Sequence, residues 1–187
     1  MMKFGGKGHT MHLFSFVRGD FQEKYIAELQ ESLHLASIAT HTRRDLIHVK
    51  NLTSLFPSSH SIFHALYYSE DIANKLKEIV AKESIDVIHY ESYYTAFYLK
   101  DKIKHDTVKH VFGTENIEHK IYSAFLKERI PSLFRPFVAH MVDAIQKEEV
   151  SFLKLADMCI AVTEDEASCI RSISSTKTEI IENGIDV

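Results

Sequence analysis

The sequence has little cysteine, proline and glycine, and it contains no tryptophan. Its two cysteines, Cys159 and Cys169, form no CxxC pair, so we expect small buried side chains in a reducing compartment rather than a redox or metal motif. The three prolines and six glycines form no linker that would divide the 187 residues. We therefore expect one domain over residues 1–187, with a sizeable core because 45% of the residues are hydrophobic.

Long apolar runs and an excess of positive charge are also missing. No apolar run approaches the roughly 20 residues of a membrane-spanning helix, and the N-terminus lacks the apolar segment of a signal peptide. A cytoplasmic location is therefore expected. The net charge of −4 and the isoelectric point near 6.3 argue against binding to nucleic acid.

Known nucleotide, metal and nucleophile motifs are not matched. The segment MMKFGGKGH precedes a predicted strand, whereas a phosphate-binding loop follows a strand and carries GK[ST]. No GxGxxG follows a predicted strand, which argues against a dinucleotide oxidoreductase. His60 and His64 have i, i+4 spacing but no evident third ligand, so we predict no metal site. No Ser-His-Asp or Cys-His arrangement can be argued from spacing.

Apolar runs of strand length alternate with segments of helical periodicity along the chain. This alternation predicts an α/β fold: a Rossmann-like, doubly wound, mostly parallel sheet with helices on both faces. Between the predicted helices and strands, Ser58–Tyr68 is predicted to be a surface loop. The predicted strands are Met11–Val17, Leu33–Thr40, Ile85–Tyr90, Thr107–Phe112, Met158–Val162 and Thr178–Glu182, and the helices are Asp20–Ser32, Arg43–Phe56, Glu70–Lys82, a segment after Ser92, and Ser132–Leu155.

The longest helical segment, Ser132–Leu155, carries an apolar stripe that includes Phe134, Phe137 and Phe152. Such a stripe is typical of a core helix or of an amphipathic helix on a membrane. Asp143, Glu148 and Glu149 argue against attraction to anionic lipid, so a principal core helix is predicted.

The C-terminal stretch contains two motifs in order. Met158–Val162 (MCIAV) is a buried strand pattern, and Thr163 with Glu166 forms a capping box that starts a helix. ADMCIAVTE, followed by EIIENGID, resembles the end of the first domain of the GT-B glycosyltransferases, specifically the retaining family 4. That family has an AD…V(S/T)E strand and helix, then a strand ending in NG(I/V)D.

This resemblance implies transfer of a sugar from a nucleotide-sugar donor to a glycan, lipid-linked or small-molecule acceptor, with retained configuration and without a metal or other cofactor. In that family the first domain shapes the acceptor side, and a second domain grips the donor with a pair of glutamates. The chain ends at NGIDV, and the family's first strand and Gly-rich loop have no counterpart at its start. We therefore expect a truncated N-terminal half of a GT-B enzyme of glycan biosynthesis, inactive alone, and either cytoplasmic or peripheral at the membrane.

Substrate-binding residues follow from the same comparison. The segment IDVIHY resembles the family's DV(I/V)H strand, whose following loop faces the cleft between domains, and ligands of open α/β sheets bind beyond the carboxyl ends of strands. This implicates Glu91, Ser92 and Tyr93. The alternative is that Ser92 caps a helix among solvated neighbours.

After TVKHVF, the residues Asn116, Glu118 and His119 match the later part of a family motif resembling EHN-V-EH. Its earlier histidine position is occupied by Glu115, so no catalytic residue is assigned. Glu115, Asn116 and His119 are predicted to contact substrate, as is Thr163; alternatively, Thr114 and Glu115 only cap a helix.

A second hypothesis is a non-catalytic Rossmann-like binding or interaction module. The unmatched first strand would leave a sheet edge open, which favours self-association by strand pairing.

Overall fold

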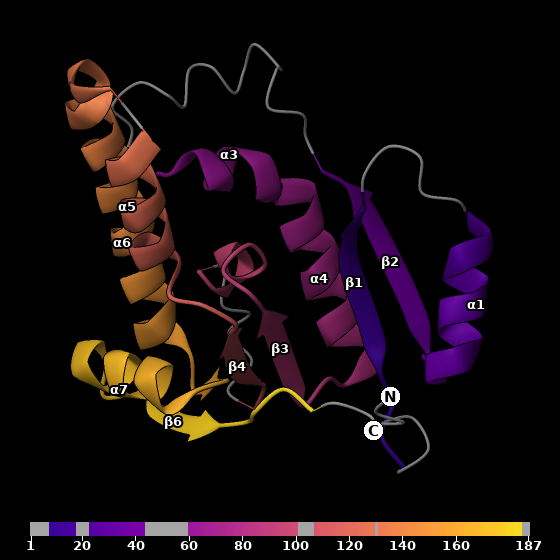
Figure 1. Cartoon of the computed structure of the whole chain (residues 1–187). Coiled ribbons are helices and arrows are strands. Elements are labelled where there is room, and N and C mark those ends of the chain that lie inside the picture. Colours follow the sequence, from indigo (N-terminus) through magenta and orange to yellow (C-terminus); the bar gives the residue numbers. More distant parts are fainter. Residues whose placement is uncertain (1–7, 18–22, 44–59, 101–106, 130, 185–187) are drawn as a thin grey trace. The chain divides into compact units, whose positions relative to one another are not determined.

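The computed structural model describes residues 8–17, 23–43, 60–100, 107–129 and 131–184, with only the backbone for 23 and 126–129. The described residues belong to two compact units, one within residues 1–45 and the other within 46–184. Each unit contains a parallel sheet whose strands alternate with helices (Figure 1). The predicted Rossmann-like α/β character is therefore confirmed.

The first unit contains two strands and one helix. Strand β1 (His12–Val17) pairs in parallel with β2 (Ser37–Thr42), and α1 (Glu23–Leu33) connects them. The strand predicted from Leu33 begins only at Ser37, because α1 continues through Leu33. His34, with a φ of 53°, then ends the helix in the left-handed conformation that is common after helices. The predicted helix Arg43–Phe56 lies outside the described residues, apart from Arg43.

The second unit is built on a four-stranded parallel sheet. Its order is β3 (Val87–Glu91), β4 (Lys109–Thr114), β5 (Met158–Ala161) and β6 (Lys177–Ile180). Because all four strands are parallel, their carboxyl ends share one edge. The other elements of this unit are α3 (Ile62–Tyr67), α4 (Glu70–Glu83), the 3-10 turns η3 (Ala96–Leu99) and η4 (Ser132–Phe134), α5 (Glu118–Arg129), α6 (Arg135–Leu155) and α7 (Glu164–Ile173).

The core of the second unit is an aromatic cluster between the sheet and α6. Phe112 of β4 and Phe152 of α6 are fully buried, with ring centroids 6.2 Å apart. Phe97 of η3 lies 5.3 Å from Phe152, edge to face, and 5.2 Å from Tyr93. Aromatic rings in this geometry contribute more than their buried area alone. The cluster therefore anchors the segment that follows β3 to α6.

The segment predicted as a loop, Ser58–Tyr68, contains a helix instead. Ser61 is the N-cap of α3, and its hydroxyl accepts a hydrogen bond from the backbone N–H of His64 over 3.3 Å. The imidazoles of His60 and His64 stack with centroids 4.2 Å apart. Among the described residues, no group of three or more His, Cys, Asp or Glu is placed to hold a metal ion.

Helix α6 is only partly a core helix. Ile145 and Phe152 are buried as predicted, but Phe137 and the preceding Phe134, which caps the start of α6, are 43% and 56% exposed. Glu148 and Glu149, two of the acidic residues that argued against attraction to anionic lipid, are 2% and 1% exposed. The first part of α6 thus presents apolar side chains to solvent, while its second part buries two carboxylates.

Candidate functional site

The carboxyl edge of the four-stranded sheet collects most of the predicted site residues. Glu91 at the end of β3 is paired with Gly113 of β4, and Thr114 at the end of β4 is paired with Ala161 of β5. The loops after β3, β4 and β5 therefore start side by side. We call this edge, with Glu91, Ser92, Glu115, Asn116 and Thr163 in its loops, the carboxyl rim.

The loop after β3 makes a sharp turn at the rim. Ser92 has a φ of 73°, and its N–H donates to the carbonyl oxygen of Gly113 over 3.1 Å. The hydroxyl of Thr95 donates to the carbonyl of Glu91 over 2.6 Å. A non-glycine residue in this φ region is strained by roughly 1–3 kcal/mol, so the surrounding hydrogen bonds must hold it there.

Glu91 is exposed and has a histidine beside it. Nε2 of His89 lies 3.4 Å from a carboxylate oxygen of Glu91. A Cβ atom on Gly113 would come within 2.7 Å of that same Nε2. Because Gly113 has no side chain, the imidazole of His89 can lie across β4 next to Glu91.

Tyr93 lies behind the rim rather than on it. The residue is 2% exposed, and its hydroxyl donates to Oε2 of Glu148 over 2.6 Å. Burial, and then the charge of Glu148, raise the pKa of Tyr93 above its ordinary value. The same Glu148 accepts the backbone N–H of Ser61 over 3.0 Å, so it ties the start of α3 to the loop after β3.

His119 is held by the neighbouring carboxylate of α6. Glu149 accepts hydrogen bonds from Nδ1 of His119 and from the backbone N–H of Glu118, the latter over 2.8 Å. This caps the first turn of α5 and fixes which imidazole nitrogen carries a proton. Burial, followed by the charges of Glu149 and Glu115, raises the pKa of Glu118 above its ordinary value.

The remaining predicted residues differ in their surroundings. Glu115 and Asn116 are exposed between β4 and α5. Thr163 is the N-cap of α7, where its hydroxyl accepts the N–H of Glu166 over 3.2 Å, as its capping-box motif predicts. The carboxylate of Glu166 accepts the N–H of Val162 over 3.3 Å. The start of α7 is thus capped by its own residues.

Glu148 and Glu149 are functional candidates that sequence reasoning missed. Consecutive helical residues point about 100° apart, which lets the two carboxylates serve the loops after two different strands. A signal for them was present: both stand between Ile145 and Phe152, at positions where the buried stripe should be apolar. Buried carboxylates at such positions require hydrogen-bond donors.

The chemistry available at the rim is that of hydrogen-bond acceptors. Exposed carboxylates accept hydrogen bonds from hydroxyl groups, and the amide of Asn116 can both donate and accept. The imidazoles of His89 and His119 lie beside carboxylates. This set suits a ligand rich in hydroxyl groups.

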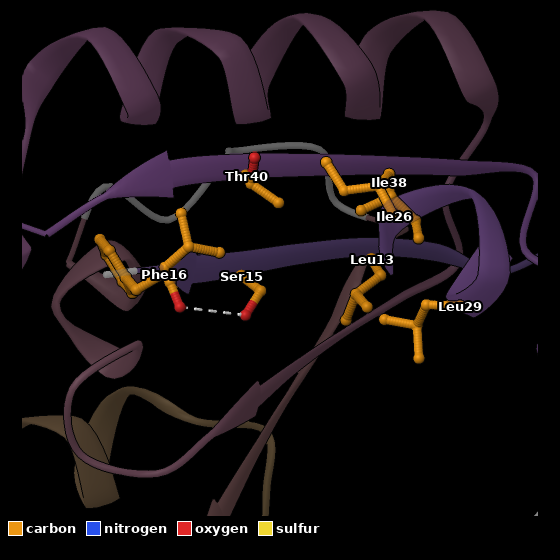
Figure 2. A pocket seen from close by; sticks show the side chains of 8 residues that line it. Leu13, Ser15, Phe16, Ile26, Leu29, Ile38 and Thr40 are labelled. Carbon is orange, nitrogen blue, oxygen red and sulfur yellow. Dashed lines mark hydrogen bonds between the residues drawn. The ribbon is translucent and has the colours of Figure 1, made fainter. Parts of the chain in front are cut away.

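A pocket of about 280 Å³ lies in the first unit and contains none of these residues. Leu13 of β1, Ile26 and Leu29 of α1, and Ile38 of β2 surround it, with Ser15 and Thr40 as its polar residues (Figure 2). Its walls are therefore mainly apolar, in contrast to the carboxyl rim.

The family model described as Glycosyltransferase Family 4 matches residues 5–187, nearly the whole chain. No curated protein matches the chain. In the part of the chain that the structure describes, no helix is long and apolar enough to cross a membrane.

Proposed function

Because the chain belongs to glycosyltransferase family 4, we propose that it forms the acceptor-side domain of an enzyme that moves a sugar from a nucleotide-sugar donor to an acceptor. Retention of configuration and independence from a metal are part of this proposal. The observation that carries it is the acidic character of the carboxyl rim.

Acidic side chains surround the rim, and their charge discriminates between the two substrates. A nucleotide-sugar donor carries a diphosphate, which nearby carboxylates repel. An acceptor offers hydroxyl groups, which carboxylates bind as hydrogen-bond acceptors. Arg171 offsets only one of these charges, that of Glu164, from which its Nη1 lies 2.8 Å. The acidic residues in the rim loops and in the first turns that follow them are Glu91, Glu115, Glu118, Glu164, Asp165 and Glu166.

The residues at the rim divide into two groups in this proposal. Glu91, Ser92, Glu115 and Asn116 contact the acceptor from the loops, and His119 contacts it from the start of α5. Tyr93 and Thr163, also predicted to bind substrate, support the loops through Glu148 and through the α7 cap. No residue is assigned a catalytic role.

The donor is bound by a second domain in this account, so residues 1–187 alone bind nucleotide sugars weakly and transfer no sugar. The acceptor is a glycan, a lipid-linked sugar or a small molecule. The cell compartment proposed is the cytoplasm, with contact to the membrane surface.

Calorimetric titration of UDP-glucose and GDP-mannose into the chain tests this proposal. We expect dissociation constants weaker than about 1 mM, because the diphosphate meets carboxylates. Replacing Glu91 and Glu115 with glutamine removes two charges from the rim and should not create tight donor binding. Submicromolar affinity of the unmodified chain for either donor would contradict an acceptor-side assignment.

A second candidate function, a non-catalytic interaction module, is favoured by the edge of β3. Within the described residues, β3 pairs with β4 alone, and Val87 is 54% exposed. An open edge can pair with a second copy. Light scattering after size exclusion separates the candidates: a concentration-dependent dimer that V87K abolishes supports the module, and a monomer at all concentrations counts against it.

A further inference from the structure

Three aromatic rings from different parts of the second unit meet beside the carboxyl rim. Tyr94 belongs to the loop after β3, Phe63 to α3 and Tyr122 to α5. The ring centroid of Phe63 lies 5.4 Å from that of Tyr94 and 5.1 Å from that of Tyr122. The hydroxyl groups of the two tyrosines form a hydrogen bond over 3.0 Å. We call Phe63, Tyr94 and Tyr122 the aromatic platform.

The aromatic platform adjoins the loops that form the carboxyl rim. Tyr94 follows Ser92 by two residues, and Tyr122 lies about one helical turn after Glu118. In Figure 1, α3 lies on the side of the sheet toward which β3 points, and Phe63 brings it into contact with α5. The platform therefore extends the carboxyl rim on the side of α3.

Neighbouring rings hold the platform in place while it keeps contact with solvent. The ring of Phe63 meets that of Tyr93 edge to face, with centroids 6.1 Å apart, and Tyr67 packs on Tyr94 at 4.8 Å. Tyr93 is 2% exposed, whereas all three platform residues are only partly buried. Aromatic side chains fixed in this way lose little conformational entropy when a ligand binds to them.

The charges around the platform favour a neutral ligand. Burial is the main cause that raises the pKa of Tyr94 and of Tyr122 above the ordinary value, so both phenols keep their protons. The carboxylate of Glu118 lies beside Tyr94. Among the described residues, the lysines that lie over aromatic rings are Lys24 and Lys100, and neither is at the platform. A phosphate group would meet the carboxylate with no cation over the rings to balance it.

We propose that the aromatic platform binds a pyranose ring of a sugar acceptor through the C–H face of that ring. The axial C–H bonds of a pyranose carry a partial positive charge, which the negative face of an aromatic ring attracts. The hydroxyl groups around the pyranose can then donate hydrogen bonds to the carboxylates of the rim. A nucleobase would also stack on these rings, but the donor that carries it brings a diphosphate toward the same carboxylates.

This inference rests on the proposed function and narrows its acceptor class. An acceptor that presents only an alcohol or a phosphate would leave the platform unused. The acceptor is therefore a glycan or another glycoside, and its sugar ring is the part that the chain recognises.

Transfer of magnetisation from the aromatic protons of the protein to a ligand tests the platform in the unmodified chain. Three probes are compared by nuclear magnetic resonance: methyl β-glucoside, which has a C–H face, erythritol, an open-chain polyol without one, and uridine, which carries a base but no phosphate. We expect saturation to reach one set of axial C–H protons of the glucoside more strongly than its other protons. Erythritol and uridine should receive little saturation.

Matched variants locate the contact. Y122L removes one ring of the platform and should weaken the affinity for methyl β-glucoside about fivefold, because a contact between rings is lost. Y122F keeps the ring and should weaken the affinity by less than about twofold. Y25L removes a ring of the first unit that is 47% exposed and should leave the affinity unchanged. Titrations that follow the amides of Glu91 and Asn116 measure all of these affinities.

The outcomes separate this inference from the proposed function. If the glucoside shifts the rim amides but receives no saturation from aromatic protons, or if Y122L binds it as well as Y25L does, the platform is wrong and the acceptor-side assignment stands. Saturation of uridine in place of the glucoside, or equal saturation of erythritol, would overturn the proposal as well. No response of the rim amides to the glucoside would contradict both the platform and the proposed function.

Discussion

Glu149, buried on α6, accepts a hydrogen bond from Nδ1 of His119, the second residue of α5. The same carboxylate caps the first turn of α5 through the N–H of Glu118. Its neighbour Glu148 accepts hydrogen bonds from the hydroxyl of Tyr93 and the backbone N–H of Ser61. Two consecutive glutamates of one helix thus hold the segments that follow β3 and β4, and the proposed acceptor site depends on them.

Removing the Glu149 carboxylate should loosen the start of α5. We expect E149A to lower the free energy of unfolding by about 1–3 kcal/mol, because the N–H groups of α5 lose a buried acceptor. E149Q keeps one acceptor oxygen and should lose less. E78A, at an exposed position of α4, serves as the control in urea denaturation and should change stability by less than about 0.5 kcal/mol. Equal effects of E149A and E78A would contradict the assigned role.

Tyr93 should stabilise the native state through its hydroxyl. Y93F leaves Glu148 with one donor fewer, so we expect a loss of about 1–3 kcal/mol. The control Y94F removes the hydroxyl of Tyr94, which meets that of Tyr122 in a partly buried contact. It should lower the free energy of unfolding by less than Y93F does. The folded state raises the pKa of Tyr93, so the unfolded chain gives up this proton first as pH rises. The stability advantage over Y93F should therefore shrink above about pH 10. Denaturation of the unmodified chain and of Y93F at several pH values around 10 measures the difference in their free energies of unfolding. A difference that does not change with pH would count against the hydrogen bond between Tyr93 and Glu148.

The two phenylalanines at opposite ends of α6 should respond differently to truncation. F152A removes a fully buried ring that contacts Phe97 and Phe112, and we expect it to cost about 3–5 kcal/mol. F137A removes a ring that is 43% exposed and should cost less than about 1 kcal/mol. Thermal unfolding compares them. Similar losses would mean that the whole of α6 is a core helix, as its periodicity alone predicted.

The two cysteines should differ in reactivity. Burial raises the pKa of Cys159 to about 12, so its thiolate fraction at pH 8 is only about one in ten thousand. Cys169 is partly exposed. Mass spectrometry after brief treatment with iodoacetamide should therefore find Cys169 modified and Cys159 unmodified, whereas unfolding in urea should make both react. Modification of Cys159 in the native protein would contradict its placement in β5.

Sequence reasoning located strands that contain an apolar run followed by polar residues, as in MCIAV before Thr163. It started β2 too early, because SIATHT is not such a run and α1 continues through Leu33. It missed α3 because six residues rich in aromatic side chains have no helical stripe of their own; contacts distant in sequence, such as Ser61 to Glu148, support that helix. It gave Glu148 and Glu149 no place in the core because periodicity weighs only apolar residues. The carboxyl rim was predictable from strand direction. The hydrogen bonds by which Glu148 and Glu149 hold its loops depend on packing between distant segments, which a single sequence does not show.

Mapping of ligands onto the backbone amides by nuclear magnetic resonance tests the central claim most directly. Methyl glucoside and methyl mannoside serve as acceptor probes, and UDP-glucose serves as the donor. The account predicts that the glycosides shift the amides of Glu91, Ser92, Glu115 and Asn116, and that UDP-glucose gives no saturable shift there below about 1 mM. Saturation of those amides by micromolar UDP-glucose, with no response to either glycoside, would contradict it.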